Sequence, residues 1–217
     1  MFTSRFQRWV RDHAHAVASA LARLGLTPNQ VTVVGMLISF GAGALIALGQ
    51  LLPGGLVLAL GGIFDVFDGA LARVTGRGSD YGAFVDSTLD RYSEAAVLVG
   101  IAVYFAARPD GRLGVLFTLV ALVGSFLVSY ARARAQSLGF TCEGGLFARP
   151  ERVVVTVAGL VLGPTVLLWV MGLLAILTNV TAAQRIAGVY RQTRGPAPQP
   201  KREAVARPGK PATHPRL

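Results

Sequence analysis

The segment "FDVFDGALARVTGRGSDYGAFVDSTLDR", residues 64–91, places four aspartates among apolar residues. Asp65 and Asp68 are three residues apart, and Asp86 and Asp90 are four apart. At these spacings the two members of each pair share one face of a helix. Two adjacent helices could therefore direct four carboxylates at one point.

Four converging carboxylates indicate chemistry with a hard divalent cation. Their oxygens suit Mg²⁺, or Mn²⁺ in its place, and the groups would repel one another unless a cation lay among them. Mg²⁺ is typically shared between a few carboxylates and substrate phosphates, where it offsets the charge that develops in displacement at phosphorus. The pattern therefore predicts a phosphate-bearing substrate. Arg73 is placed to contact its phosphate oxygens, and a spare carboxylate could accept the proton of an attacking hydroxyl.

An alternative is that the aspartates lie at helix ends in water, paired with Arg73 and Arg91. That alternative does not explain the small residues between them, which allow backbones or a ligand to approach closely. These residues are Gly69, Ala72, Gly78 and Gly82. Carboxylates on membrane helices normally face a cavity that has a function, which favours the first interpretation.

The composition indicates that lipid surrounds these segments. Of the 217 residues, 53% are hydrophobic and only 15% are charged, and the mean hydropathy is +0.53, which excludes an ordinary soluble domain. Several apolar windows are about 20 residues long, enough to cross a hydrocarbon core of roughly 30 Å as helices. Period-2 alternation is absent, and an open sheet cannot satisfy its backbone in lipid. The sequence therefore predicts an all-α integral membrane protein.

Six transmembrane helices are expected, at about residues 30–49, 52–75, 82–106, 113–137, 150–163 and 165–189. The fifth is short, and the break at Gly163-Pro164 could instead be a kink, which would leave five crossings. An even count places the arginine-rich connections on one side, which the positive-inside rule assigns to the cytoplasm. We therefore expect a multi-pass protein of the cell membrane, with its active site and both termini cytoplasmic.

The regions that flank this domain, residues 29–190, have their own character. Residues 1–28 have apolar residues at helical spacing between arginines, which predicts an amphipathic helix lying in the membrane interface or packed on the cytoplasmic ends of the bundle. Residues 191–217 are basic and rich in Pro, which predicts a disordered tail, free in water or near anionic lipid. The net charge of +10 requires no nucleic acid, because topology and membrane lipids account for it.

The aspartate segment also carries a wider pattern: Asp65-x2-Asp68-Gly69-x2-Ala72-Arg73-x8-Gly82-x3-Asp86-x3-Asp90. This pattern resembles the complete signature of the CDP-alcohol phosphotransferases. The resemblance implies a homodimer that transfers a substituted phosphate from a CDP-linked lipid to an alcohol and releases CMP. It implies that Asp65, Asp68 and Asp86 bind the metals and that Asp90, beside them, is the general base. The residues expected to bind the CDP-lipid are Asp65, Asp68, Gly69, Ala72, Arg73 and Gly82, with Asn29 and Thr32 as weaker candidates.

The acceptor is suggested by a second segment, "SYARARAQSLGFTCEGGLFARPERVVV", residues 129–155. Its four arginines are more cation than a neutral alcohol requires, and so favour a polyol phosphate unless they serve only topology. The segment is similar to the phosphatidylinositol phosphate synthases, whose "SY-x-KARA" and "RPER" patterns line an inositol-phosphate pocket. That similarity implies that Ser129, Arg132 and Arg152 bind the acceptor's phosphate. Arg132 stands where those proteins commonly have Lys, which keeps the charge and changes the donor geometry.

The expected reaction is transfer of a phosphatidyl group from CDP-diacylglycerol to inositol 1-phosphate. Glycerol 3-phosphate as acceptor, as in a phosphatidylglycerophosphate synthase, and CDP-archaeol as donor are the alternatives within the family. A cation transporter would need its carboxylates near the membrane midplane, without Arg73 and Arg91 beside them. A purely structural protein would have no reason to keep both carboxylate pairs in register.

Overall fold

The computed structural model describes residues 18–20, 22–76, 79–142 and 149–194, and this part of the chain contains helices and no strands. Each predicted span overlaps one helix, so the prediction of an all-α protein is confirmed. The predicted N-terminal amphipathic helix and the tail fall largely outside the described residues. The helices are α2 Pro28–Ala47, α3 Leu51–Thr75, α4 Asp80–Ala106, α5 Arg112–Ser137, α6 Arg149–Leu162 and α7 Pro164–Arg194.

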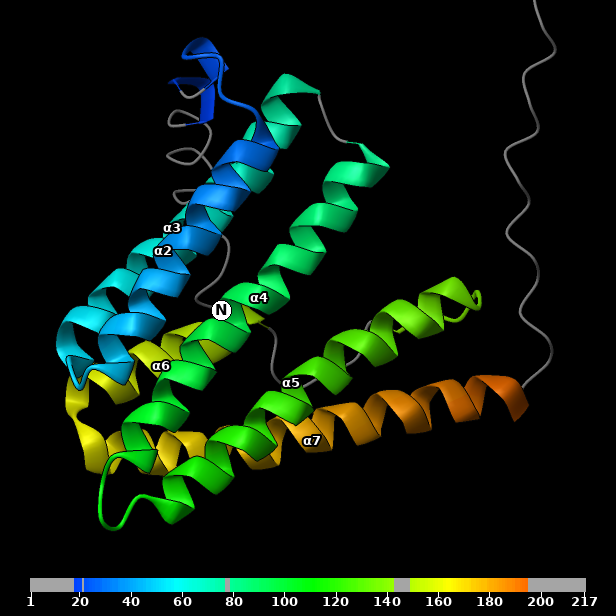
Figure 1. Cartoon of the computed structure of the whole chain (residues 1–217). Coiled ribbons are helices and arrows are strands. Elements are labelled where there is room, and N and C mark those ends of the chain that lie inside the picture. Colours follow the sequence, from blue (N-terminus) through cyan, green and yellow to red (C-terminus); the bar gives the residue numbers. More distant parts are fainter. Residues whose placement is uncertain (1–17, 21, 77–78, 143–148, 195–217) are drawn as a thin grey trace, which may run out of the picture.

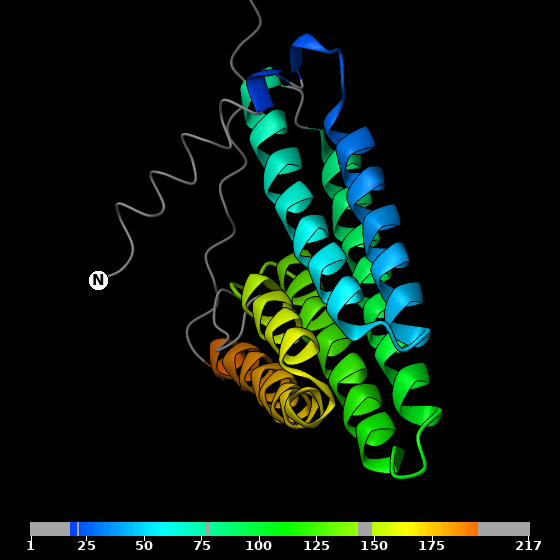
Figure 2. The ribbon, with the colours of Figure 1, turned by 90° about the vertical axis from the view of Figure 1, so that its left-hand side faces the viewer.

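Each of the described helices, labelled in Figure 1, packs against two others, and these contacts close a ring. Helix α2 packs against α3 and α4, α3 packs against α6, α4 against α5, and α7 closes the ring by packing on α5 and α6. Figure 2 shows α2, α3 and α4 as one group beside α5, α6 and α7. Successive helices alternate in direction, so the end of α3, the start of α4 and the start of α6 meet at one end of the ring. That end carries the predicted site residues, and we call it the site end.

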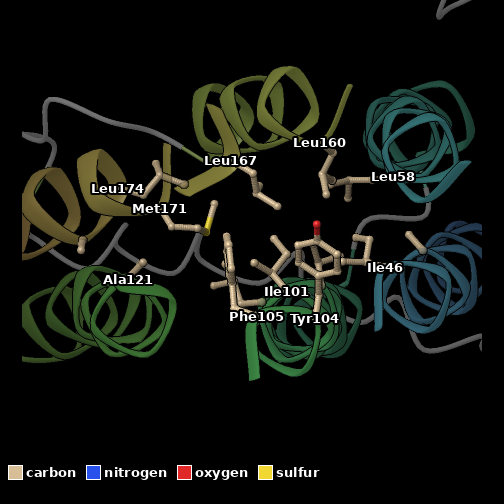
Figure 3. Packing of buried hydrophobic residues seen from close by; sticks show 14 residues of the cluster. Ile46, Leu58, Ile101, Tyr104, Phe105, Ala121, Leu160, Leu167, Met171 and Leu174 are labelled. Atoms are coloured by element: carbon tan, nitrogen blue, oxygen red, sulfur yellow. The ribbon is translucent and has the colours of Figure 1, made fainter. Parts of the chain in front are cut away.

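The opposite end of the ring contains most of the apolar core. Residues near the end of α2 and α4 meet residues near the start of α3 and α7 (Figure 3). Labelled members of this cluster include Ile46, Leu58, Ile101, Tyr104, Phe105, Leu160, Leu167 and Met171. Because burial of apolar side chains holds the helices together here, the polar groups of the site end do not have to supply the packing.

Short-range signals fix where the site-end helices begin. Thr27 caps α2: its hydroxyl accepts a hydrogen bond from the Gln30 backbone at 3.3 Å, and the Gln30 side chain accepts one from the Thr27 backbone at 2.9 Å. The Ser79 hydroxyl caps α4 by accepting from the Gly82 backbone at 3.0 Å. Helix α3 ends at Gly76, whose φ of 60° is left-handed. The chain therefore turns at defined residues on either side of the aspartates.

Four of the helices are long and apolar enough to cross a membrane: α2, α3, α5 and α7. Helix α4 carries Asp80, Asp86, Asp90, Arg91 and Glu94 within residues 80–94, and α6 has only 14 residues. A membrane protein is therefore indicated, while the count of six crossings stays a prediction.

Helix α7 is longer than the sequence predicts. Residues 191–194, which the sequence assigns to the tail, continue the helix. The Gln192 side chain holds this last turn against the segment after α5, because its carbonyl accepts from the backbone and hydroxyl of Thr141 and its amide donates to the Thr141 carbonyl oxygen. These long-range contacts, 51 residues apart, have no local signal.

Helices α2 and α4 touch backbone to backbone at two glycines. A Cβ added at Gly43 would lie 2.4 Å from the carbonyl oxygen of Ala96, and one at Gly100 would lie 2.2 Å from that of Gly43. Small residues permit this close approach between membrane helices. Gly41, also on α2, has nothing within 4 Å of its added Cβ.

We predict that Gly43→Ala lowers the free energy of unfolding by about 1–3 kcal/mol, because the methyl group forces α2 and α4 apart. Gly41→Ala is the matched control: both substitutions gain the same helix propensity, and only the first creates a clash. The measurement is the thermal unfolding midpoint of each variant in detergent. Equal midpoints for the two variants would contradict the close packing of α2 on α4.

Candidate active site

The structure brings the four aspartates together at the site end. Asp65 and Asp68 lie in the C-terminal half of α3, and Asp86 and Asp90 lie in the N-terminal half of α4. Asp68 is buried, with 7% of its surface exposed, and the other three are half-buried. The carboxylates of Asp65, Asp68 and Asp90 each interact electrostatically with that of Asp86. The helical spacing therefore does produce one acidic cluster from two helices.

Thr32 of α2 fixes the most buried of these carboxylates. Its hydroxyl lies 3.0 Å from Asp68 Oδ2 and donates a hydrogen bond to it, and it lies equally close to the carbonyl oxygen of Pro28, one turn earlier. Both Thr32 and Asp68 are buried. A hydrogen bond to a buried charged oxygen fixes its orientation, so Thr32 determines where Asp68 points.

One cavity of about 210 Å³ lies between the start of α2, the end of α3 and the start of α4. Its lining unites most of the residues expected to bind the CDP-lipid, together with one aspartate from each pair. These lining residues are Asn29, Thr32, Asp68, Gly69, Ala72, Gly82 and Asp86. We call it the donor cavity.

Two residues expected in this set lie elsewhere. Arg73 is exposed and does not line the donor cavity, although its Nη1 lies 3.6 Å from the position of a Cβ on Gly69. Asp65 lines a second, smaller cavity of about 40 Å³, which we call the inner cavity. The acidic cluster therefore separates Asp65 from the residues that line the donor cavity.

The inner cavity is lined by side chains from all six helices, and its polar lining is unusual for a membrane bundle. Asp65, Glu94, Arg149 and Arg152 all line it, and so do four residues with hydroxyl groups. The hydroxyls belong to Ser39, Ser93, Ser125 and Thr156, all of them buried. Such a lining offers hydrogen bonds to a hydroxylated or charged molecule, although about 40 Å³ has room for only a few waters, so a larger molecule requires the lining side chains to move.

Arg149, the first residue of α6, links the two aspartate-bearing helices. Its Nη2 lies 3.0 Å from Asp65 Oδ2, and its Nη1 pairs with Asp90 Oδ1. Asp90 also pairs with the neighbouring Arg91 at 3.4 Å through its other oxygen. Arg149 is a residue to which the sequence assigned no individual role.

Arg152, one turn further along α6, is buried and has a carboxylate partner of its own. Its Nε lies 2.8 Å from one oxygen of Glu94 and its Nη2 lies 3.2 Å from the other, so the pair is bidentate. Glu94 is not among the site residues predicted from the sequence. The signal was present, because Glu94 follows Asp86 and Asp90 at a further spacing of four and so continues their face of α4.

The three residues expected to bind the acceptor's phosphate do not line one cavity. Arg152 lines the inner cavity, whereas Ser129 accepts a hydrogen bond at 3.0 Å from Arg91 and lines an open groove between α4 and α5. Arg132 is exposed. Arg185 of α7, which the sequence analysis did not single out, interacts electrostatically with both Arg132 and Arg152. The basic residues of α5, α6 and α7 thus share one neighbourhood beside the acidic cluster.

The acidic cluster fits a divalent cation by its chemistry, since its donors are all hard carboxylate oxygens. In the arrangement described, however, no three His, Cys, Asp or Glu side chains among the described residues converge on a metal position. The guanidinium of Arg149 lies between Asp65 and Asp90 instead. The cluster therefore already contains a positive charge, and a metal ion would require these side chains to rearrange.

The sequence of this chain is similar to those of known proteins. The sequence model of the CDP-alcohol phosphatidyltransferase family matches residues 25–184. A phosphatidylinositol phosphate synthase of Mycobacterium marinum is 38% identical over 182 residues, which cover 80% of this chain and 78% of the relative. An archaetidylinositol phosphate synthase of Pyrococcus horikoshii is 38% identical over 185 residues, which cover 84% and 94%.

Solved structures agree with the fold as well. The crystal structure of Mycobacterium tuberculosis phosphatidylinositol phosphate synthase with CDP-DAG bound matches with a TM-score of 0.76 at 36% identity, over 82% of this chain and 93% of that one. The same enzyme in complex with manganese and citrate matches with a TM-score of 0.77 at 36% identity, over 82% and 88%. The family match includes both aspartate helices and both cavities, and it confirms the resemblance seen in the aspartate spacing. This chain belongs to the CDP-alcohol phosphatidyltransferase family.

Proposed function

We propose that this protein is a phosphatidylinositol phosphate synthase, which transfers the phosphatidyl group of CDP-diacylglycerol to inositol 1-phosphate and releases CMP. The observation that carries the proposal is the inner cavity, where buried hydroxyls and two arginines adjoin the acidic cluster. Hydroxyls suit a polyol ring and arginines suit its phosphate. Relatives named for inositol phosphate products support the same acceptor.

The donor's CDP group would lie in the donor cavity. Gly69 and Gly82 line this cavity without side chains, so a pyrophosphate can approach the backbone there closely. The aspartates Asp65, Asp68, Asp86 and Asp90 would hold divalent cations, Mg²⁺ by preference, which supply positive charge to the pyrophosphate. A relative solved with manganese supports a divalent cation at this site. Arg73 borders the cavity beside Gly69, where its guanidinium can reach a phosphate.

The acceptor's hydroxyl would lie next to Asp90. This carboxylate, which pairs with Arg149 and Arg91 in the structure described, can accept the proton as the hydroxyl oxygen attacks phosphorus. Arg152, fixed by Glu94, would bind the acceptor's phosphate in the inner cavity, and Arg132 and Ser129, which do not line that cavity, would have to move to join it. The P–O bond to CMP breaks as the new P–O bond forms, so CMP leaves from the donor cavity.

We also propose six crossings, with the site end and both termini in the cytoplasm and with two copies forming a homodimer. Helices α4 and α6 are members of the ring and pack against the apolar helices on either side, which supports their crossing with them. The charges of α4 lie within residues 80–94, at the site end. The nucleotide and polyol phosphate are cytoplasmic solutes, which supports this orientation. Residues 1–28 and 191–217 are proposed to contact the cytoplasmic membrane surface.

We expect the purified protein to release CMP from CDP-diacylglycerol with Mg²⁺ when inositol 1-phosphate is added, and not with glycerol 3-phosphate or free inositol. The measurement is CMP formed with each acceptor in parallel, with CDP-archaeol as a second donor. Turnover with glycerol 3-phosphate alone would contradict inositol 1-phosphate as the acceptor but would still agree with the family assignment. Turnover only from CDP-archaeol would show that the donor is CDP-archaeol and not CDP-diacylglycerol.

We predict that Asp90→Asn lowers CMP release by roughly 10²- to 10⁴-fold, because the amide cannot accept the proton of the attacking hydroxyl. The control is Asp80→Asn, in the exposed first turn of the same helix, which should keep full activity. CMP release and the thermal midpoint are measured for both. Retained turnover in Asp90→Asn would show that another group is the base.

We predict that Thr32→Val raises the Mg²⁺ concentration needed for half-maximal activity on the order of tenfold, because Asp68 loses a charge-assisted hydrogen bond. Thr32→Ser keeps the hydroxyl and should behave like the unmodified protein. Activity is titrated against Mg²⁺ and, separately, against CDP-diacylglycerol. A raised KM for the lipid with an unchanged Mg²⁺ requirement would mean that Thr32 contacts the nucleotide and does not orient Asp68.

A further inference from the structure

Arg149 holds together two carboxylates that the proposed reaction needs for a metal ion. Its guanidinium uses Nη2 for Asp65 on α3 and Nη1 for Asp90 on α4. The side chain is largely enclosed, with 22% of its surface exposed. The three helices that carry these groups thus meet at one positive charge.

A divalent cation and this guanidinium compete for the same oxygens. Mg²⁺ binds carboxylate oxygens at about 2.0–2.1 Å, whereas the Arg149 nitrogens already occupy Asp65 Oδ2 and Asp90 Oδ1. Two cations in one partly buried site also repel each other strongly. This competition explains why no three carboxylates among the described residues converge as a metal site.

Once displaced, Arg149 would stand beside the substrates. It lines the inner cavity with Arg152, whose guanidinium is kept in place by its bidentate pair with Glu94. Within the described part of the chain, the ion pairs of Arg149 are those with Asp65 and Asp90, and its buried Nε makes no hydrogen bond. A released guanidinium with donors to spare is suited to a phosphate group, which it can bind in a bidentate manner.

We propose that Arg149 exchanges partners during the reaction cycle. In the metal-free protein it neutralises Asp65 and Asp90, and when a divalent cation binds it gives up these carboxylates and becomes a ligand for a substrate phosphate. The inference rests on the proposed function, because it requires Asp65 and Asp90 to be metal ligands. Arg152 keeps its bidentate pair with Glu94, so the exchange concerns Arg149 alone.

The first test measures Mn²⁺ binding to the full-length protein without substrates, from the electron paramagnetic resonance signal of free Mn²⁺. Arg149→Gln should bind Mn²⁺ on the order of tenfold more tightly than the unmodified protein, because the competing cation is gone. Arg91→Gln is the matched control: it also removes a cation paired with Asp90, but one that does not touch Asp65. It should change the affinity by about twofold at most, because Arg91 is more exposed.

Weaker or unchanged Mn²⁺ binding in Arg149→Gln, or an equal gain in Arg91→Gln, would overturn the exchange. Absence of Mn²⁺ binding in every variant would overturn both the exchange and the metal assignment. If Arg149→Gln does not fold, Arg149→Lys serves in its place, since a single ammonium cannot bridge both carboxylates in the same way. Its Mn²⁺ affinity should then exceed that of the unmodified protein.

The second test identifies the phosphate, at saturating Mg²⁺. Arg149→Gln should raise the KM for inositol 1-phosphate if the guanidinium binds the acceptor, or the KM for CDP-diacylglycerol if it binds the donor. Unchanged values for both would contradict the phosphate role. Lack of turnover with inositol 1-phosphate in the unmodified protein would instead refute the proposed acceptor, and the Mn²⁺ titration would still decide whether Arg149 competes with metal.

Discussion

Carboxylates on largely apolar helices are the constraint on which the rest of this structure depends. An ionised carboxylate removed from water costs several kcal/mol unless a donor or cation compensates it. The chain supplies most of this compensation from another helix, so polar and charged pairs link the helices at the site end. These pairs are Thr32 with Asp68, Asp65 and Asp90 with Arg149, and Glu94 with Arg152.

The two ends of the ring therefore have different roles. Apolar side chains hold the helices at one end, and the backbone contact at Gly43 and Gly100 keeps α2 and α4 in fixed contact. At the site end, charged groups hold one another in place while leaving cavities between them. Under the proposed function, substrates and metal would replace existing ionic contacts, which requires less reorganisation than creating a charged site in an apolar bundle.

Local patterns predict much of this site, and long-range pairings account for what they miss. The helices and the aspartate cluster follow from hydropathy and from spacings of three and four, because helix geometry alone puts such residues on one face. Arg149 and Glu94 pair with residues on other helices, Glu94 with one 58 positions away, and only the closed ring decides those partners. The three predicted acceptor residues likewise do not share one cavity in this structure, because Arg152 lines the inner cavity whereas Ser129 accepts a hydrogen bond from Arg91 and lines the groove between α4 and α5.

The acidic cluster separates two cavities, since Asp68 and Asp86 line one and Asp65 lines the other. Under the proposed function, a donor in the first and an acceptor in the second, enlarged by movement of its lining side chains, would be present together on opposite sides of the phosphorus atom. Reaction within such a ternary complex is a single displacement with no phosphatidylated enzyme. A direct displacement from opposite sides inverts the configuration at phosphorus. Inversion in the product would therefore reflect the placement of the two cavities on opposite sides of the acidic cluster.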